Sequence, residues 1–218
     1  MARIAELLDE KIEGAANLAP IVIGDTAEGR VDLSGIDFDK LAKLFEVSPK
    51  LAADTLREEA EDKARKLANG NPTRVHLIER LEKLIAEYNT GAIDVERLFE
   101  QLKAFIGEMT DEEHRAAREG LSEAELALYD LLTTPESKLS AAQEREVKLI
   151  AKHLLEKLTE AVASVDWLRS QETRGQVRHQ IKLALNDLPQ EPYPDDLWQA
   201  KVERVWEFVT QRYAPTAH

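Results

Sequence analysis

The stretch from Asn71 to Leu132 carries closely spaced signals for starting and ending helices, and these most strongly constrain how the chain can fold. Asn71-Pro72 places a preferred N-cap residue before a proline at the first helical position. Ser122 and Glu125 have the spacing of a capping box, and Gly120 stands where a helix is expected to end. These signals predict successive helices that belong to one helical domain.

Two further start signals lie inside this stretch. Asp94 is a favoured N-cap residue and precedes an apolar pattern of helical period, so a helix is expected to begin there. Thr110 and Glu113 also have capping-box spacing, which predicts the start of a separate helical piece that Gly120 closes. The paired acids Glu112-Glu113 are therefore expected in a first turn, where negative charge meets the positive end of the helix dipole.

The remainder of the chain is also expected to be mostly helical, because apolar residues recur there at helical spacing. Helices are expected near residues 2–14 and 49–67, along a long amphipathic run that follows Ser140, and over residues 171–188 and 195–213. Residues 15–36 carry no helical period and are expected to form two short extended pieces or an ordered connector. The positions expected to face inward include Leu51, Leu56, Val75, Ile78, Leu81, Leu98, Leu102, Val147, Ile150, Leu154, Val177, Ile181, Val202 and Val205.

The predicted fold class is therefore all-α. We expect a multi-helix, bundle-like domain over residues 71–213, preceded by a partly irregular connector of helices over residues 1–70 and followed by a tail at 214–218. Little or no β-structure is expected. A chain of 218 residues is long enough to bury a substantial core.

The charge is strongly negative overall but unevenly distributed. With a net charge of −13, the whole molecule is expected to repel nucleic acid and anionic membranes. Residues 71–132 carry 7 basic and 14 acidic side chains, whereas residues 138–186 carry 9 basic and 6 acidic ones, a local balance of +3. Arg174, Arg178 and Lys182 in that second region follow an i, i+4, i+8 pattern, so they form one basic stripe on a helix.

Two interpretations of the basic stripe stay open. It is either an outer face neutralised by the acidic remainder of the molecule, or a contact to DNA phosphate or to an acidic partner surface. Tryptophans are usually core residues, but one exposed beside the stripe would be a good interface anchor. Arg169, Lys148 and Lys152 are candidates to extend the stripe. The candidate contact residues are therefore Arg169, Arg174, Arg178, Lys182, Lys148, Lys152 and Trp167.

Catalytic machinery is not visible in the sequence. There is no cysteine, which excludes disulfides and thiolate zinc sites, and there is no glycine-rich phosphate loop or nucleophile elbow. Glu61-Asp62-Lys63 and Glu146-Val147-Lys148 match the end of a nuclease Glu-x-Lys signature. Both are expected in the middle of helices, where we interpret them as solvated faces. No catalytic residue, cofactor site or metal ligand is predicted in this chain.

The chain is expected to be cytoplasmic. Acidic residues in the first 14 positions are incompatible with the apolar core of a signal peptide. No apolar run approaches the roughly 20 residues that a membrane-spanning helix needs.

An ordered series of segments resembles a known family. Taken together, the series is similar to the C-terminal region of the restriction (R) subunit of type I restriction–modification enzymes and runs from near residue 4 to near Tyr213. Its segments are Leu8-Asp9-Glu10-Lys11-Ile12, Asp32-Leu33-Ser34-Gly35-Ile36-Asp37-Phe38, Asn71-Pro72-Thr73-Arg74, Glu87-Tyr88-Asn89-Thr90-Gly91, Ile93-Asp94-Val95-Glu96, Glu119-Gly120-Leu121-Ser122-Glu123, Ala127-Leu128-Tyr129-Asp130-Leu131-Leu132, and Val165-Asp166-Trp167 with Arg174 and Arg178.

The resemblance implies a part of a larger machine. The R subunit is an ATP-dependent, DNA-translocating site-specific deoxyribonuclease that uses ATP and Mg²⁺ and joins the methyltransferase and specificity subunits. Its nuclease and helicase motifs lie upstream of the matched region, so this chain is expected to be a C-terminal fragment that is not an enzyme alone.

Three hypotheses follow. The first is an assembly domain that docks the motor, in the rest of the R subunit, onto the methyltransferase–specificity core. Such a domain should leave an apolar patch exposed. The alternative is a helical domain that contacts double-stranded DNA through the basic stripe. An independent small-molecule enzyme or cofactor-binding bundle ranks last, because it would need a deep pocket with converging polar groups.

Overall fold

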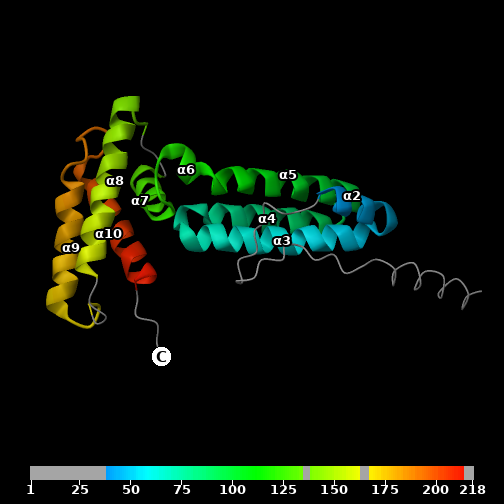
Figure 1. Cartoon of the computed structure of the whole chain (residues 1–218), viewed down its shortest axis with the longest axis horizontal. Coiled ribbons are helices and arrows are strands. Elements are labelled where there is room, and N and C mark those ends of the chain that lie inside the picture. Colours follow the sequence, from blue (N-terminus) through cyan, green and yellow to red (C-terminus); the bar gives the residue numbers. More distant parts are fainter. Residues whose placement is uncertain (1–37, 135–137, 163–166, 214–218) are drawn as a thin grey trace, which may run out of the picture. The chain divides into compact units, whose positions relative to one another are not determined.

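The computed structural model describes residues 38–134, 138–162 and 167–213. These residues form helices and their connections, with no strand among them, which confirms the all-α fold class (Figure 1). The expected helix at 2–14, the connector at 15–36 and the tail at 214–218 lie outside these ranges. Among the helices of the described ranges, none combines the length and apolar character needed to cross a membrane.

The chain divides into two compact units between Ala52 and Ala53. In the first unit the described residues form α2 (Phe38–Val47), which buries Leu41 and Leu44, and the first turn of α3 (Pro49–Gly70). The rest of α3 belongs to the second unit. The expected domain boundary after residue 70 stays a prediction.

The first half of the second unit contains the rest of α3 and the elements up to Glu119. After α3 come the 3₁₀ turn η2 (Pro72–Arg74), α4 (Val75–Asn89), α5 (Val95–Glu113) and the short α6 (Arg115–Glu119). α4 packs against α5 and η2. The buried apolar residues of α3, α4 and α5 in this unit are Ala53, Leu56, Ala60, Ala64, Leu67, Leu77, Leu81, Leu98, Phe99, Leu102, Phe105, Ile106 and Met109.

Two positions expected to be buried are exposed. Leu51 is 53% exposed and Val75 is 50% exposed. In α4 the apolar residues form two overlapping stripes, and packing against α5 buries the one through Leu77 and Leu81. Around Leu51 the buried positions of α3 are instead the small residues Ala52 and Ala53.

The expected helix start at Thr110 is wrong. α5 continues to Glu113, and the Thr110 hydroxyl donates to the carbonyl of Ile106 at 2.9 Å, one turn back in the same helix. Glu112 and Glu113 therefore lie at the end of a helix and not in a first turn. Their carboxylates accept hydrogen bonds from cations elsewhere in the chain, which offsets the unfavourable position at the negative end of the dipole. The break comes at His114, before α6.

The other capping signals are confirmed. Asp94 accepts a hydrogen bond from the backbone N–H of Arg97 at 2.8 Å, and Gly120 ends α6 with a left-handed φ of 65°. The structure contains both reciprocal bonds of a capping box at Ser122 and again at Ser140. Helices begin where the sequence predicts because these bonds join residues only three positions apart.

The second half of this unit is a group of four helices, α7 (Glu123–Thr133), α8 (Ala141–Ala161), α9 (Gln171–Leu185) and α10 (Asp195–Arg212). α8 packs against α7 and α9, and α10 packs against α9 and α7 (Figure 1). The buried core of these helices includes Leu128, Leu131, Leu132, Val147, Ile150, Leu154, Leu158, Trp167, Val177, Ile181, Leu185, Val202, Val205, Phe208 and Val209.

Candidate partner interface

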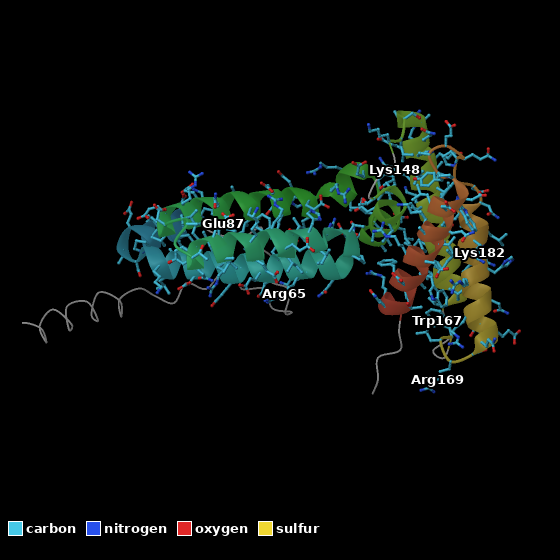
Figure 2. The ribbon with its side chains drawn as sticks, turned by 180° about the vertical axis from the view of Figure 1, so that it is seen from behind. Arg65, Glu87, Lys148, Trp167, Arg169 and Lys182 are labelled. Carbon is cyan, nitrogen blue, oxygen red and sulfur yellow. The ribbon has the colours of Figure 1, made fainter. Side chains whose placement is uncertain are left out.

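The basic stripe predicted from the sequence lies on α9. Ser170 caps the helix by accepting from the backbone N–H of Thr173, and Val177, Ile181 and Leu185 bury the inner face. Arg174 and Lys182 are exposed, and no ion pair of either is found among residues 38–134, 138–162 and 167–213. Figure 2 shows Lys182 on the outside of the four-helix group.

Arg178, the middle member of the stripe, has an internal partner. Its Nη2 donates to the carboxylate of Glu203 on α10, and its guanidinium lies 5.4 Å from the centre of the Trp206 ring. The side chain of Arg178 is nevertheless 39% exposed. Glu203 therefore neutralises part of the stripe, while the outer edge of Arg178 stays accessible.

Lys148 and Lys152 do not extend the stripe. Lys148 Nζ donates to the carboxylate of Glu119 and lies 5.5 Å from the centre of the Tyr129 ring, while Lys152 Nζ donates to the Gly120 carbonyl at 3.0 Å. The hydrogen bond from Lys148 lowers the pKa of Glu119 below its usual value. Both lysines thus hold α8 against the end of α6. Figure 2 shows Lys148 at the opposite end of the helical group from Arg169.

Trp167 is a core residue and not an exposed anchor. It is 1% exposed, its indole Nε1 donates to the Tyr213 carbonyl at 3.0 Å, and its ring meets Trp206 edge-on with centres 6.0 Å apart. Arg169, two residues later, is exposed. The stripe is therefore reduced to its three α9 members, with Arg169 just before the helix.

A group of paired charges around the buried Arg74, which was not predicted from the sequence, joins η2 to α5 and α7. Arg74 is 2% exposed. Its Nε donates to Glu112 Oε1 at 2.8 Å and its Nη1 donates to Glu123 Oε2 at 3.0 Å. Three elements are thereby fixed around one guanidinium.

Arg115 continues this group. Its Nε donates to the same Glu112 oxygen at 2.9 Å, and its two terminal nitrogens donate to the two carboxylate oxygens of Asp130. The pKa of Arg115 is raised by the hydrogen bond and the charge of Asp130, although burial opposes the shift. Asn71 Nδ2 donates to Asp130 at 2.6 Å. We call Asn71, Arg74, Glu112, Arg115, Glu123 and Asp130 the polar network, in which Asn71, Arg74 and Asp130 are buried.

The network joins segments that the family resemblance had already marked. Asn71-Pro72-Thr73-Arg74, the stretch ending at Glu123 and the stretch containing Asp130 are separate in sequence but meet here. The family resemblance singled out these segments, but their spacing in the sequence could not show that they are in contact.

Two hollows adjoin the start of α4. The polar pocket, of about 390 Å³, lies beside the network and is lined by Thr73, Arg74, His76, Leu77, Arg80, Glu108, Glu112, Arg115, Asp130 and Thr134. The second, which we call the apolar groove, has a volume of about 520 Å³ and is lined by Ala68, Asn69, Pro72, Val75, Ile78, Phe208, Gln211 and Arg212.

The arginines and carboxylates that line the polar pocket are paired with one another. Its three arginines, Arg74, Arg80 and Arg115, each hold a carboxylate. In the part of the chain that the structure describes, no cluster of histidine, aspartate and glutamate side chains could hold a metal ion. Both Glu-x-Lys matches lie on helices as expected, but Lys63 is 1% exposed and is not on a solvated face.

Comparison with known proteins gives a consistent result. A family model described as "Type I restriction enzyme HindI endonuclease subunit-like, C-terminal" matches residues 2–213. A protein of Methanocaldococcus jannaschii, named as a type I restriction enzyme MjaIXP endonuclease subunit, is 25% identical over 156 residues. That alignment covers 71% of this chain and 15% of the relative, so the chain spans a small part of the relative's length. No solved structure matches.

Proposed function

Because the chain belongs to the family of C-terminal regions of type I restriction enzyme endonuclease subunits, we propose that it is a non-catalytic assembly domain. In this proposal it docks the DNA-translocating motor of the R subunit onto the methyltransferase–specificity core. Cleavage and translocation, with their requirement for ATP and Mg²⁺, belong to other parts of the subunit.

The observation that carries this proposal is the apolar groove. Its walls come from the end of α3, η2 and the start of α4 on one side and from the end of α10 on the other. Val75 is 50% exposed within it, although it is a large apolar residue. Protein interfaces combine such an apolar centre with a polar rim, and here Asn69, Gln211 and Arg212 supply polar groups.

Residues next to those that line the groove are held in place by other contacts. Arg74, the residue before Val75, is fixed by Glu112 and Glu123, and Asn71, before Pro72, is fixed by Asp130. On the other wall the Arg212 guanidinium lies 5.8 Å from the centre of the Phe208 ring. A surface whose backbone is already held loses less conformational entropy on binding, which favours affinity.

The occupant we infer is a segment of the methyltransferase–specificity core that inserts an apolar side chain and places a carboxylate near Arg212. The groove has the volume of a site that holds a few anchoring groups. The family of the chain supports the choice of the partner, and the residues that line the groove support the chemistry of the inserted segment.

The test is a quantitative pull-down of the full chain with the purified methyltransferase–specificity core. Val75→Asp places a carboxylate at the first position of α4, where a negative charge is compatible with the helix dipole, so the variant should fold. We expect affinity for the core to fall at least about tenfold, as for loss of an interface hot spot.

The matched control is Leu149→Asp, which makes the same kind of change at a residue that is 57% exposed on α8. It should bind the core as the unchanged chain does. If Val75→Asp binds the core as tightly as the unchanged chain, or if both variants lose the same affinity, the groove is not the docking surface. Failure of the unchanged chain to bind the core would reject the docking role itself.

A further inference from the structure

The outer face of α9 has an unusual composition for so acidic a protein. At 100° per residue, Gln171, Arg174, Gly175, Arg178, His179 and Lys182 fall within an arc of about 140°. Apart from the buried Leu185 at the last position of the helix, that arc contains no carboxylate and no aliphatic or aromatic side chain; Glu172 and Leu183 lie outside it. We call it the α9 basic face.

The charges of this face are available to a partner. Arg174 and Lys182 are exposed and without an ion pair in the described parts of the chain, and Arg178 is partly exposed. Glu203 on α10 is the counterion of Arg178. Glu172 lies on the same helix outside the arc, and physiological salt screens those carboxylates that are farther than about 8 Å from the face.

Gly175 is a second, independent observation. It lies inside α9 with an ordinary helical backbone, and a Cβ placed there would meet nothing within 4 Å. Glycine destabilises a helix interior relative to alanine, and internal packing does not require it here. On an outer face, it lets an external backbone approach closely. Gly107 on α5 is equally open, but its neighbours Lys103 and Glu108 are of opposite sign and both are ion-paired.

We propose that the α9 basic face contacts the sugar–phosphate backbone of double-stranded DNA. Arginine, lysine, glutamine and accessible backbone are the groups that bind phosphate oxygens. The face lacks the aromatic or apolar centre expected of a protein interface. Arg174 and Lys182 are roughly 12 Å apart along the helix, so the two side chains are far enough apart to contact different phosphates.

This inference does not depend on docking through the apolar groove. It is tested by fluorescence-anisotropy titration of a labelled duplex with the full chain at several salt concentrations. For Arg174→Gln/Lys182→Gln, we expect affinity to fall at least about tenfold at low salt. The slope of log K against log salt should decrease by about two units, since each phosphate contact contributes about 0.9.

Three further variants sharpen the test. Arg65→Gln/Lys157→Gln removes the same charge from exposed positions on α3 and α8, at 60% and 56% side-chain exposure, and should bind DNA as the unchanged chain does (Figure 2 shows Arg65). Glu203→Gln frees Arg178 and should strengthen binding several-fold. Gly175→Ala should weaken binding even though it favours the helix.

Absent binding at low salt, or equal losses in the two double variants, would overturn the proposal. The same variants are also assayed against the methyltransferase–specificity core. If Arg174→Gln/Lys182→Gln loses the core while DNA binding is unchanged, the face contacts an acidic protein surface instead. Because Val75→Asp leaves the α9 basic face intact, failure of docking and failure of DNA contact are distinguished.

Discussion

Asn71 and Asp130 are 59 positions apart and form a hydrogen bond of 2.6 Å in the interior of the protein. Asn71 is fully buried and Asp130 is 4% exposed. The same Asn71 side chain accepts from the backbone N–H of Thr73 at 3.1 Å, so it caps η2 while it binds α7. A local start signal thereby also fixes the tertiary position of the turn that leads into α4.

Asp130→Ala is expected to destabilise the protein strongly. It removes the carboxylate that Arg115 and Asn71 share, and breaking a buried charge pair from one side costs about 3–5 kcal/mol. Urea unfolding followed by circular dichroism measures the loss. The control, Glu108→Ala, breaks the exposed pair with Arg80 and should cost less than about 1 kcal/mol. Similar losses in the two variants would contradict a structural role for the polar network.

Glu113→Ala is expected to cost more stability than Lys63→Met. Lys63 is 1% exposed, and its Nζ donates to Glu113 at 2.8 Å and to Thr110 at 2.9 Å. Removing Glu113 leaves a buried ammonium group without its counterion, at a cost of about 2–3 kcal/mol after allowance for the partial exposure of Glu113. Methionine replaces the lysine by an apolar group of similar shape. Chemical denaturation ranks the two variants, and the reverse order would count against this explanation.

The stability of the protein is expected to depend on Lys201 between about pH 8 and 10.5. Burial lowers the pKa of Lys201 to about 8 from its ordinary 10.5, with a smaller contribution from Arg204. In this window the unfolded chain binds more protons at this lysine than the folded chain does. The Lys201 contribution to the free energy of unfolding therefore rises with pH, on the order of 3 kcal/mol over the whole window.

The measurement compares the unchanged protein with Lys201→Met from pH 7.5 to 9.5, because the difference isolates this lysine from other groups. Lys201 Nζ donates to the carbonyls of Leu131 and Thr134, which lie at the end of α7. The variant loses those hydrogen bonds at every pH, so the slope and not the absolute stability is diagnostic. Parallel pH profiles for the two proteins would show that Lys201 does not titrate there.

Gly175→Ala and Gly120→Ala are expected to have opposite effects on stability. Gly175 has a helical backbone and open space around its Cβ position, so alanine should stabilise the protein by roughly 0.5–1 kcal/mol. Gly120 has a φ of 65°, a conformation that costs an L-residue about 1–2 kcal/mol. Differential scanning calorimetry measures both shifts. A lower melting temperature for the Gly175 variant would indicate an internal role for this glycine.

Much of the helical structure could be predicted from the sequence, but the burial of side chains could be predicted only in part. The capping box at Ser122 and the helix start after Ser140 are confirmed, whereas the capping box expected at Thr110 is wrong. At Thr110 the same residue types serve a helix interior because the Glu113 carboxylate binds Lys63 instead of a local backbone N–H. Spacing identifies residues able to cap but does not show which other partners compete for them.

The candidate interface could also be predicted from the sequence only in part. The position of Arg174, Arg178 and Lys182 on one helix follows from their spacing. The burial of Trp167 and the pairing of Lys148 with Glu119 depend on other segments, so the sequence could not separate them from the exposed stripe.

The sequence by itself determined that this protein is helical and where most helices begin, because caps and apolar periodicity act within about four residues. Only the tertiary structure decided which lysine and arginine side chains are exposed to solvent and which are buried. Lys63 reaches a carboxylate 50 positions away, and Arg178 reaches one 25 positions away. Such pairs form when packed helices bring distant segments together, and what remains exposed after that packing defines the apolar groove and the α9 basic face.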